Sequence, residues 1–136
     1  MTLVETRRRG PGFADPDVIR KAINQRLVTN ILLDSPPKPD PDVLALCSVY
    51  LMDYDRARVL KCLSYGMPCD TDLLAWAANI SPNTTRRYRS VMVHRHIQNL
   101  KHRPAGFQIE KISRRTFIIT DQTTLQAIKL AMDAPP

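Results

Sequence analysis

The sequence lacks the patterns that mark membrane proteins and secreted, disulfide-linked domains. No stretch approaches the ~18 consecutive apolar residues that a membrane-spanning helix needs. The arginines near the start are followed by no apolar segment of the kind found in secretory signals. Cys47, Cys62 and Cys69 contain no CxxC pair, so reduced thiols are expected rather than disulfides or a zinc site. We therefore expect a cytoplasmic protein that makes no membrane contact.

Catalytic patterns are missing as well. The sequence has no glycine-rich phosphate loop, no carboxylate pair in an apolar setting, and no Ser/His/Asp or Cys/His arrangement that can be placed. The expected protein is not an enzyme and needs neither a cofactor nor a metal ion.

Positive charge is present and is concentrated in one segment. The chain of 136 residues carries a net charge of +7. Residues 86–115 hold nine basic residues against one acid, Glu110, so this segment alone carries +8 and the remainder sums to −1. Charge gathered in this way indicates a polyanionic partner. The nine are Arg86, Arg87, Arg89, Arg95, Lys101, Arg103, Lys111, Arg114 and Arg115.

The first 42 residues divide into three predicted segments. Residues 1–14 form a basic arm, which is either solvated or lies along DNA phosphates. Residues 15–34 begin with a capping aspartate and a proline and carry an apolar stripe, which predicts an amphipathic helix. That helix packs either on its own domain or on a second subunit. Residues 35–42 are rich in proline and predict an extended connector.

Residues 43–134 are predicted to form one domain. The apolar run 42–52 is compatible with a helix or a strand, and its length and the Asp42 start favour a helix. Asp53 predicts the start of a second helix that stops before Gly66. Met67, Pro68 and Cys69 are expected in a loop, after which Asp70 or Thr71 caps a helix reaching Ala78.

Residues 73–89 have the pattern of a helix-turn-helix. Leu74 and Ala78 share one helical face, and the small Ala75 permits a close crossing of the second helix. Asn79 tolerates a left-handed backbone, which suits the turn, and Ile80 is expected to fill the corner.

A long basic helix is predicted at residues 82–102. Ser81 is the expected cap, with Pro82 at the first position and Thr85 and Tyr88 facing inward. This helix would read the major groove of DNA, because arginine can pair with guanine and asparagine with adenine. The side chains predicted to contact DNA from this part of the chain are Ser81, Asn83, Thr84, Arg86, Arg87, Arg89 and Arg95.

The second half of that helix and the segment after it have different patterns. Val93, Ile97 and Leu100 repeat at helical spacing and should be buried, with His96 neutral and hydrogen-bonded at the edge of the core. Residues 107–120 alternate in polarity and predict a β-hairpin with its tip at 113–115. A hairpin tip bearing Arg114 and Arg115 would contact a phosphate or an adjacent minor groove.

Residues 53–120 resemble the effector domains of OmpR/PhoB-type response regulators. The matching stretches are DYDRARVLKCLSYG at 53–66, HIQNLK at 96–101 and IEKISRRTFII at 109–119. They correspond to the family's first helix, to the end of its recognition helix and to its hairpin. The resemblance implies a winged helix-turn-helix, with base or phosphate contacts from Arg86, Arg87 and Arg95 and phosphate contacts from Arg114 and Arg115. The preceding residues leave no room for the family's receiver domain.

The expected fold is mostly α with a small β-hairpin: a winged helix-turn-helix with additional N- and C-terminal helices. Residues 121–133 predict the C-terminal helix, which either packs on the same domain or forms a dimer contact suited to a palindromic site. The expected function is sequence-specific binding of double-stranded DNA by a bacterial or phage transcriptional regulator, associated with the nucleoid when bound. The alternative is a protein-interaction module of the same shape, an antiactivator or a regulator that binds RNA polymerase.

Overall fold

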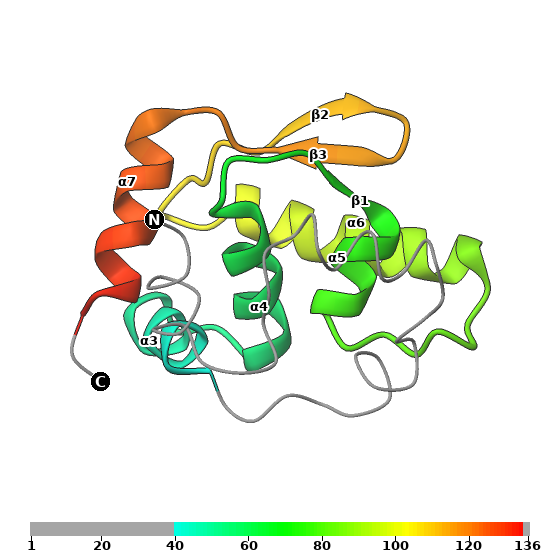
Figure 1. Ribbon diagram of the computed structural model, residues 1–136, viewed down its shortest axis with the longest axis horizontal. Helices are drawn as coiled ribbons and strands as arrows, with labels where there is room; N and C mark the ends of the chain where they lie inside the picture. Colours follow the sequence, from blue (N-terminus) through cyan, green and yellow to red (C-terminus); the bar gives the residue numbers. More distant parts are fainter. Residues whose placement is uncertain (1–39, 135–136) are drawn as a thin grey trace, which may run out of the picture.

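The structure is a computed structural model that describes residues 40–134 (Figure 1). It is mostly helical with a small three-stranded antiparallel sheet, which confirms that part of the predicted fold class. The predicted arm 1–14, the helix 15–34 and the connector up to residue 39 lie outside the described residues. In chain order the elements are α3 (Pro41–Tyr50), α4 (Tyr54–Leu63), β1 (Cys69–Asp70), α5 (Thr71–Ala77), α6 (Arg86–Lys101), β2 (Glu110–Ser113), β3 (Thr116–Ile118) and α7 (Gln122–Met132).

Each described helix begins after a capping side chain that accepts a hydrogen bond from a backbone N–H of the first turn. Four of the caps are aspartates and one is a threonine. A cap satisfies one of the amide groups that a helix start leaves without a partner, and contributes about 1 kcal/mol. The predicted caps at Asp53 and Asp70 are confirmed; the full set is Asp40, Asp53, Asp70, Thr85 and Asp121.

Helix α3 settles the ambiguous apolar run in favour of a helix. It begins at Pro41, so two residues of the predicted connector belong to the helix instead. The cause is local: Asp40 accepts from the N–H of Asp42, and a proline is well suited to the first helical position. The helix ends at Leu51, whose left-handed φ of 54° turns the chain toward α4.

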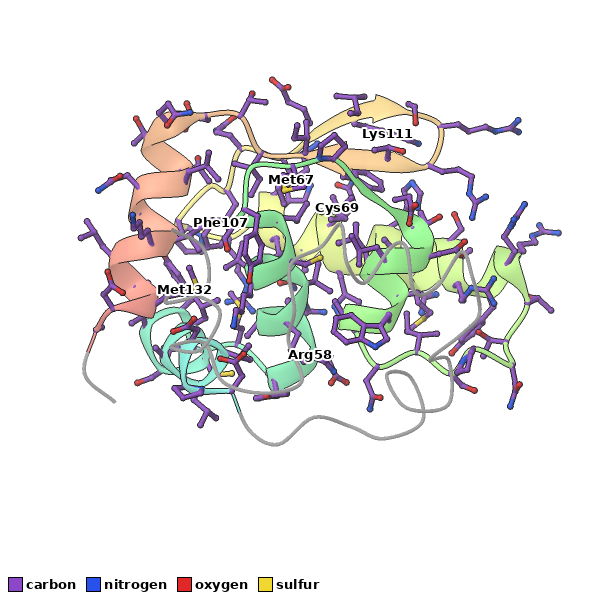
Figure 2. All side chains as sticks on the ribbon, viewed as in Figure 1. Arg58, Met67, Cys69, Phe107, Lys111 and Met132 are labelled. Atoms are coloured by element: carbon purple, nitrogen blue, oxygen red, sulfur yellow. The ribbon has the colours of Figure 1, made fainter. Side chains whose placement is uncertain are left out.

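The core lies around α4, which packs against α3, α5 and α6, while α7 covers α3 (Figure 1). Leu60 and Leu63 of α4 are fully buried, as are Val93 and Leu100 of α6, where the predicted apolar repeat is confirmed. Arg58 also points into this interior and lies 4.6 Å from the centre of the Trp76 ring, a cation–π distance (Figure 2). Within the described residues no helix is both long enough and apolar enough to cross a membrane.

A buried ion pair joins α3 to α4. The Lys61 Nζ lies 2.5 Å from an Asp40 carboxylate oxygen and 3.4 Å from Asp42, and the Lys61 side chain is completely buried. Taking a lysine out of water is costly unless carboxylates compensate for the lost hydration. The same Asp40 that caps α3 therefore also neutralises a cation under it.

The sheet has the order β1-β3-β2, with both pairings antiparallel. Phe117 and Ile119 are buried, which confirms the predicted alternation in the second strand of the hairpin. Strand β1 corrects the sequence prediction, which placed Cys69 in a loop: Cys69 pairs with Phe117. A strand of two residues is too short to give a polarity pattern, and it forms because β3 offers its free edge.

The buried ion pair between Lys61 and Asp40 leads to a prediction about stability. Replacing Asp40 by Asn keeps an acceptor for the helix cap but removes the nearer of the two carboxylate charges beside Lys61, and should lower the free energy of unfolding by about 3 kcal/mol. The matched control is Asp53→Asn, at the exposed cap of α4, which should cost well under 1 kcal/mol. Urea unfolding of both variants measures the difference, and equal losses would contradict a special role for Asp40.

Candidate nucleic-acid interface

The corner between α5 and α6 is built as the sequence predicts. Asn79 has the left-handed φ of 60°, and the N–H of Ile80 donates to the carbonyl of Ala75 at 2.9 Å. This hydrogen bond closes the C-terminus of α5. Ala75 is buried where α5 and α6 pack together.

Helix α6 starts four residues later than predicted. Ser81 caps no long helix: its side chain accepts from Asn83 N–H, and its carbonyl accepts from the N–H and the hydroxyl of Thr84. Those bonds close a turn, and Thr85 then caps α6 by accepting from Tyr88 N–H at 3.1 Å. Serine and threonine side chains compete with the backbone in this way, so the run from 81 to 85 forms a loop with a cap at its end.

The late start changes which side chains the helix presents. Ser81, Asn83 and Thr84 lie on the loop before α6, whereas Arg86 and Arg87 occupy its first turn and are exposed. Arg95 is exposed two turns further along. Its guanidinium contacts the Met92 sulfur at 3.8 Å, a weak interaction that leaves its donors available.

Thr85 and Tyr88 were predicted to face the core, and this is wrong. Both are exposed, and Tyr88 keeps 51% of its surface accessible. Helix α6 starts at residue 86, and its first fully buried residue is Val93. The face that packs on α4 and α5 therefore begins two turns into the helix, after Thr85 and Tyr88. Tyr88 instead lies among the polar side chains of the outer face.

One carboxylate holds α6 and the hairpin together. Asp72 of α5 lies 3.5 Å from the Arg89 guanidinium on α6 and 3.5 Å from that of Arg115 at the hairpin turn. Arg115 also donates to the Thr71 hydroxyl at 3.2 Å, and its carbonyl accepts from Thr71 N–H at 2.9 Å. The predicted DNA contacts Arg89 and Arg115 are thus partly buried and occupied by protein acceptors.

Arg114 differs from Arg89 and Arg115 in its exposure to solvent. It lies on the two-residue turn between β2 and β3 and is exposed. Arg86, Arg87, Arg95 and Arg114 form no ion pair with any described residue. The fold therefore divides the predicted arginines into two held internally and four presented to solvent.

A second contact fixes the hairpin along α6. The His94 Nδ1 lies 2.7 Å from the Ser90 carbonyl, which can only accept, so Nδ1 carries the proton. The His94 Nε2 lies 3.4 Å from the Lys111 ammonium on β2, and the His94 ring meets Phe117 edge-on at 5.2 Å. Lys111 extends along the hairpin on the side of α6 (Figure 2).

The outer face of α6 beside this contact is shallow and open. It is lined by Ser90, Val91, His94, Arg95 and Gln98. Helix α6 and the hairpin run side by side, and the hairpin turn lies at the end where α6 begins (Figure 1). A long partner with negative charge can contact α6 and the hairpin turn at once.

His96 was expected to be a hydrogen-bonded histidine at the core edge. It is half-buried, but its buried Nδ1 has no hydrogen-bond partner among residues 40–134. Burial lowers the pKa of His96, and the nearby Arg56 lowers it further, while Asp53 and Asp55 act in the opposite direction. The lowered pKa favours the neutral ring, as expected, but within residues 40–134 the Nδ1 atom lacks the expected hydrogen bond.

Three residues of this surface escaped the sequence reasoning: Asp72, Lys111 and Val91. Asp72 looks like an ordinary acidic residue in the first turn of a helix, and its partners lie 17 and 43 positions away. Val91 looks like a core residue by type but is 45% exposed. Lys111 was counted in the charge but not placed against His94.

Among the described residues, no group of three or more His, Cys, Asp and Glu side chains is arranged to hold a metal ion. Comparisons with known protein families, curated proteins and solved structures find nothing that matches this chain. The interpretation of the surface therefore depends on its own geometry.

The Asp72 contacts predict a local effect on the hairpin. Asp72→Ala should speed hydrogen exchange at Thr71 N–H and in β3, because the hairpin turn loses its anchor. Global stability should fall by only about 1 kcal/mol, since the side chains of these pairs are between 20% and 35% exposed. Asp55→Ala is the control, because Asp55 holds the equivalent first-turn position in α4. Faster exchange in both variants would contradict the anchoring role.

His96 predicts a pH dependence of stability. Its lowered pKa means that the unfolded chain binds the proton more readily, so the unfolding free energy falls as pH drops below the ordinary value of about 6.5. His96→Gln should lose less stability than the wild type between about pH 7.5 and about pH 5.5. His102→Gln, at an exposed position, should behave like the wild type. Urea unfolding at both pH values measures the loss of stability in each protein. Equal losses in all three proteins would rule out a contribution of His96.

Proposed function

We propose that the chain is a winged helix-turn-helix protein that binds double-stranded DNA in a sequence-dependent way and regulates transcription. The order of elements supports this: helix α4, strand β1, helices α5 and α6, then the hairpin β2–β3, with β3 between the other two strands. Helix α6 is the proposed reading helix and the hairpin is the proposed wing.

The observation that carries the proposal is the set of four exposed guanidinium groups along α6 and the hairpin turn. Arg86, Arg87 and Arg95 are exposed on α6 and Arg114 on the turn, and none has a carboxylate partner in the described structure. Uncompensated positive charge on two neighbouring protrusions suits a rod-shaped polyanion whose grooves and phosphates alternate.

The proposed roles follow from position. Arg87 and Arg95 reach base edges in the major groove, and Arg86 binds at the groove edge. Arg114 binds a phosphate beside the adjacent minor groove. Ser81 and Asn83 offer a hydroxyl and an amide donor to the DNA backbone from the loop, and Thr84, whose hydroxyl donates to the Ser81 carbonyl, holds that loop in shape. Arg89 and Arg115, held by Asp72, set the angle of the wing and add positive potential at its base.

The first experiment is selection of bound duplexes from a random-sequence library, followed by affinity measurements at two salt concentrations. One enriched sequence together with a steep decrease of affinity with salt supports a sequence-reading protein. Weak binding to every sequence would leave only a basic surface. Absence of DNA binding, with capture of another regulator or RNA polymerase, would support the alternative of a protein-interaction module.

Two arginine variants separate base reading from phosphate contact. Arg87→Ala should weaken binding to the selected site by about 1–3 kcal/mol more than binding to random DNA. Arg114→Ala should weaken both alike and reduce the salt dependence by about one unit of slope.

Lys129→Ala is the control for charge, because Lys129 is exposed on α7, away from α6 and the hairpin. It should change neither the site preference nor the slope by a comparable amount. Equal effects of Arg87→Ala on both kinds of DNA would contradict the assignment of α6 as the reading helix.

A further inference from the structure

The outer face of α6 contains two apolar side chains that the fold does not require. Tyr88 and Val91 are one turn apart and keep 51% and 45% of their surfaces exposed, amid polar and basic neighbours. Valine at an exposed helix position is disfavoured relative to alanine by about half a kcal/mol, because its branched side chain loses rotamer freedom. Helix propensity therefore does not explain Val91, and nearly half of its surface is open to a partner.

The position of Val91 distinguishes it from the single apolar residues that are common on protein surfaces. It lies on the shallow, open outer face of α6 together with His94, Arg95 and Gln98. His94 is held in place by the Ser90 carbonyl, by Phe117 and by Lys111. Arg95, one turn along from Val91, is exposed. A small apolar group of a polyanionic ligand would fit against Val91 while the arginine meets its polar atoms.

The major groove of DNA offers one apolar group, the 5-methyl of thymine. We propose that Val91 determines specificity by contacting this methyl group, so that the bound sequence contains a fixed thymine opposite Val91. This inference rests on the proposed function and adds to it a base preference. Occupation by a duplex is favoured over an apolar protein partner because Arg87 and Arg95 flank Val91 and are exposed without carboxylate partners in the described structure.

Helix geometry restricts where that thymine lies. Val91 and Arg95 are four residues apart, which places them roughly 6 Å apart along α6. Base pairs follow one another at about 3.4 Å, so the thymine should lie within about two base pairs of the base that Arg95 contacts. The Arg95→Ala variant locates that base, because it relaxes selection there.

The test removes the methyl group from the DNA and the side chain from the protein. Each thymine of the selected duplex is replaced in turn by deoxyuridine, which lacks only the 5-methyl group. Wild-type protein should bind about three- to fivefold more weakly at one position, the effect of burying one methyl group. Val91→Ala should bind the thymine duplex more weakly by a similar factor and should no longer distinguish thymine from uracil there.

Two further variants make the result specific. Val91→Thr retains a methyl group on the branched carbon and should keep part of the discrimination. Leu130→Ala removes an apolar side chain that is 62% exposed on α7 and should leave both affinity and discrimination unchanged. Circular dichroism confirms that each variant is folded.

The outcomes separate this inference from the function on which it rests. Site-selective, salt-dependent binding with no effect of uracil at any position, or an effect that persists in Val91→Ala, overturns the role of Val91 alone. A selected site without a fixed thymine overturns it as well. Absence of DNA binding overturns both proposals.

Discussion

The Asp72 carboxylate links α6 to the hairpin, and the relative position of the exposed arginines on these two elements depends on that link. The carboxylate lies at the start of α5, within 3.5 Å of an arginine on the first turn of α6 and of another at the turn of the hairpin. Arg89 and Arg115 approach it from the two sides, and their positive charges would repel each other if it were absent. The His94–Lys111 contact fixes the same two elements further along. The surface between them is therefore held at both ends.

Most of the fold could be predicted because its determinants are local in sequence. The caps at Asp53 and Asp70 and the apolar repeat Val93, Ile97 and Leu100 each act within a few residues, and each is found as predicted. The start of α6 could not be found in this way. Ser81 and Thr85 are both good caps, and the choice between them depends on where the end of α5 leaves the chain. Strand β1 depends entirely on β3, whose paired residues lie 46 and 48 positions further along the chain.

In the candidate site, too, local features could be predicted from the sequence and features that depend on distant contacts could not. The concentration of arginine in 86–115 is visible in the composition, but composition cannot tell which guanidinium groups remain exposed. Asp72 makes that distinction, because it pairs with Arg89 and Arg115, whereas Arg86, Arg87, Arg95 and Arg114 remain exposed. The exposure of Val91 could not be predicted either, because its residue type indicates a core position and only the orientation of α6 places it on the surface. Sequence predicts the chemistry of the surface; tertiary contacts select the residues that carry it.

The Lys61–Asp40 pair has a practical consequence for anyone who dissects this chain. A shortened protein starting at residue 43 would keep the hydrophobic core of residues 43–131 intact, and a boundary chosen from the proline-rich stretch would suggest that cut. It would nevertheless lose both carboxylates that the structure places beside the buried lysine, together with the cap of α3. A fragment that keeps this ion pair and the cap of α3 must therefore include Asp40, where the sequence still resembles a linker.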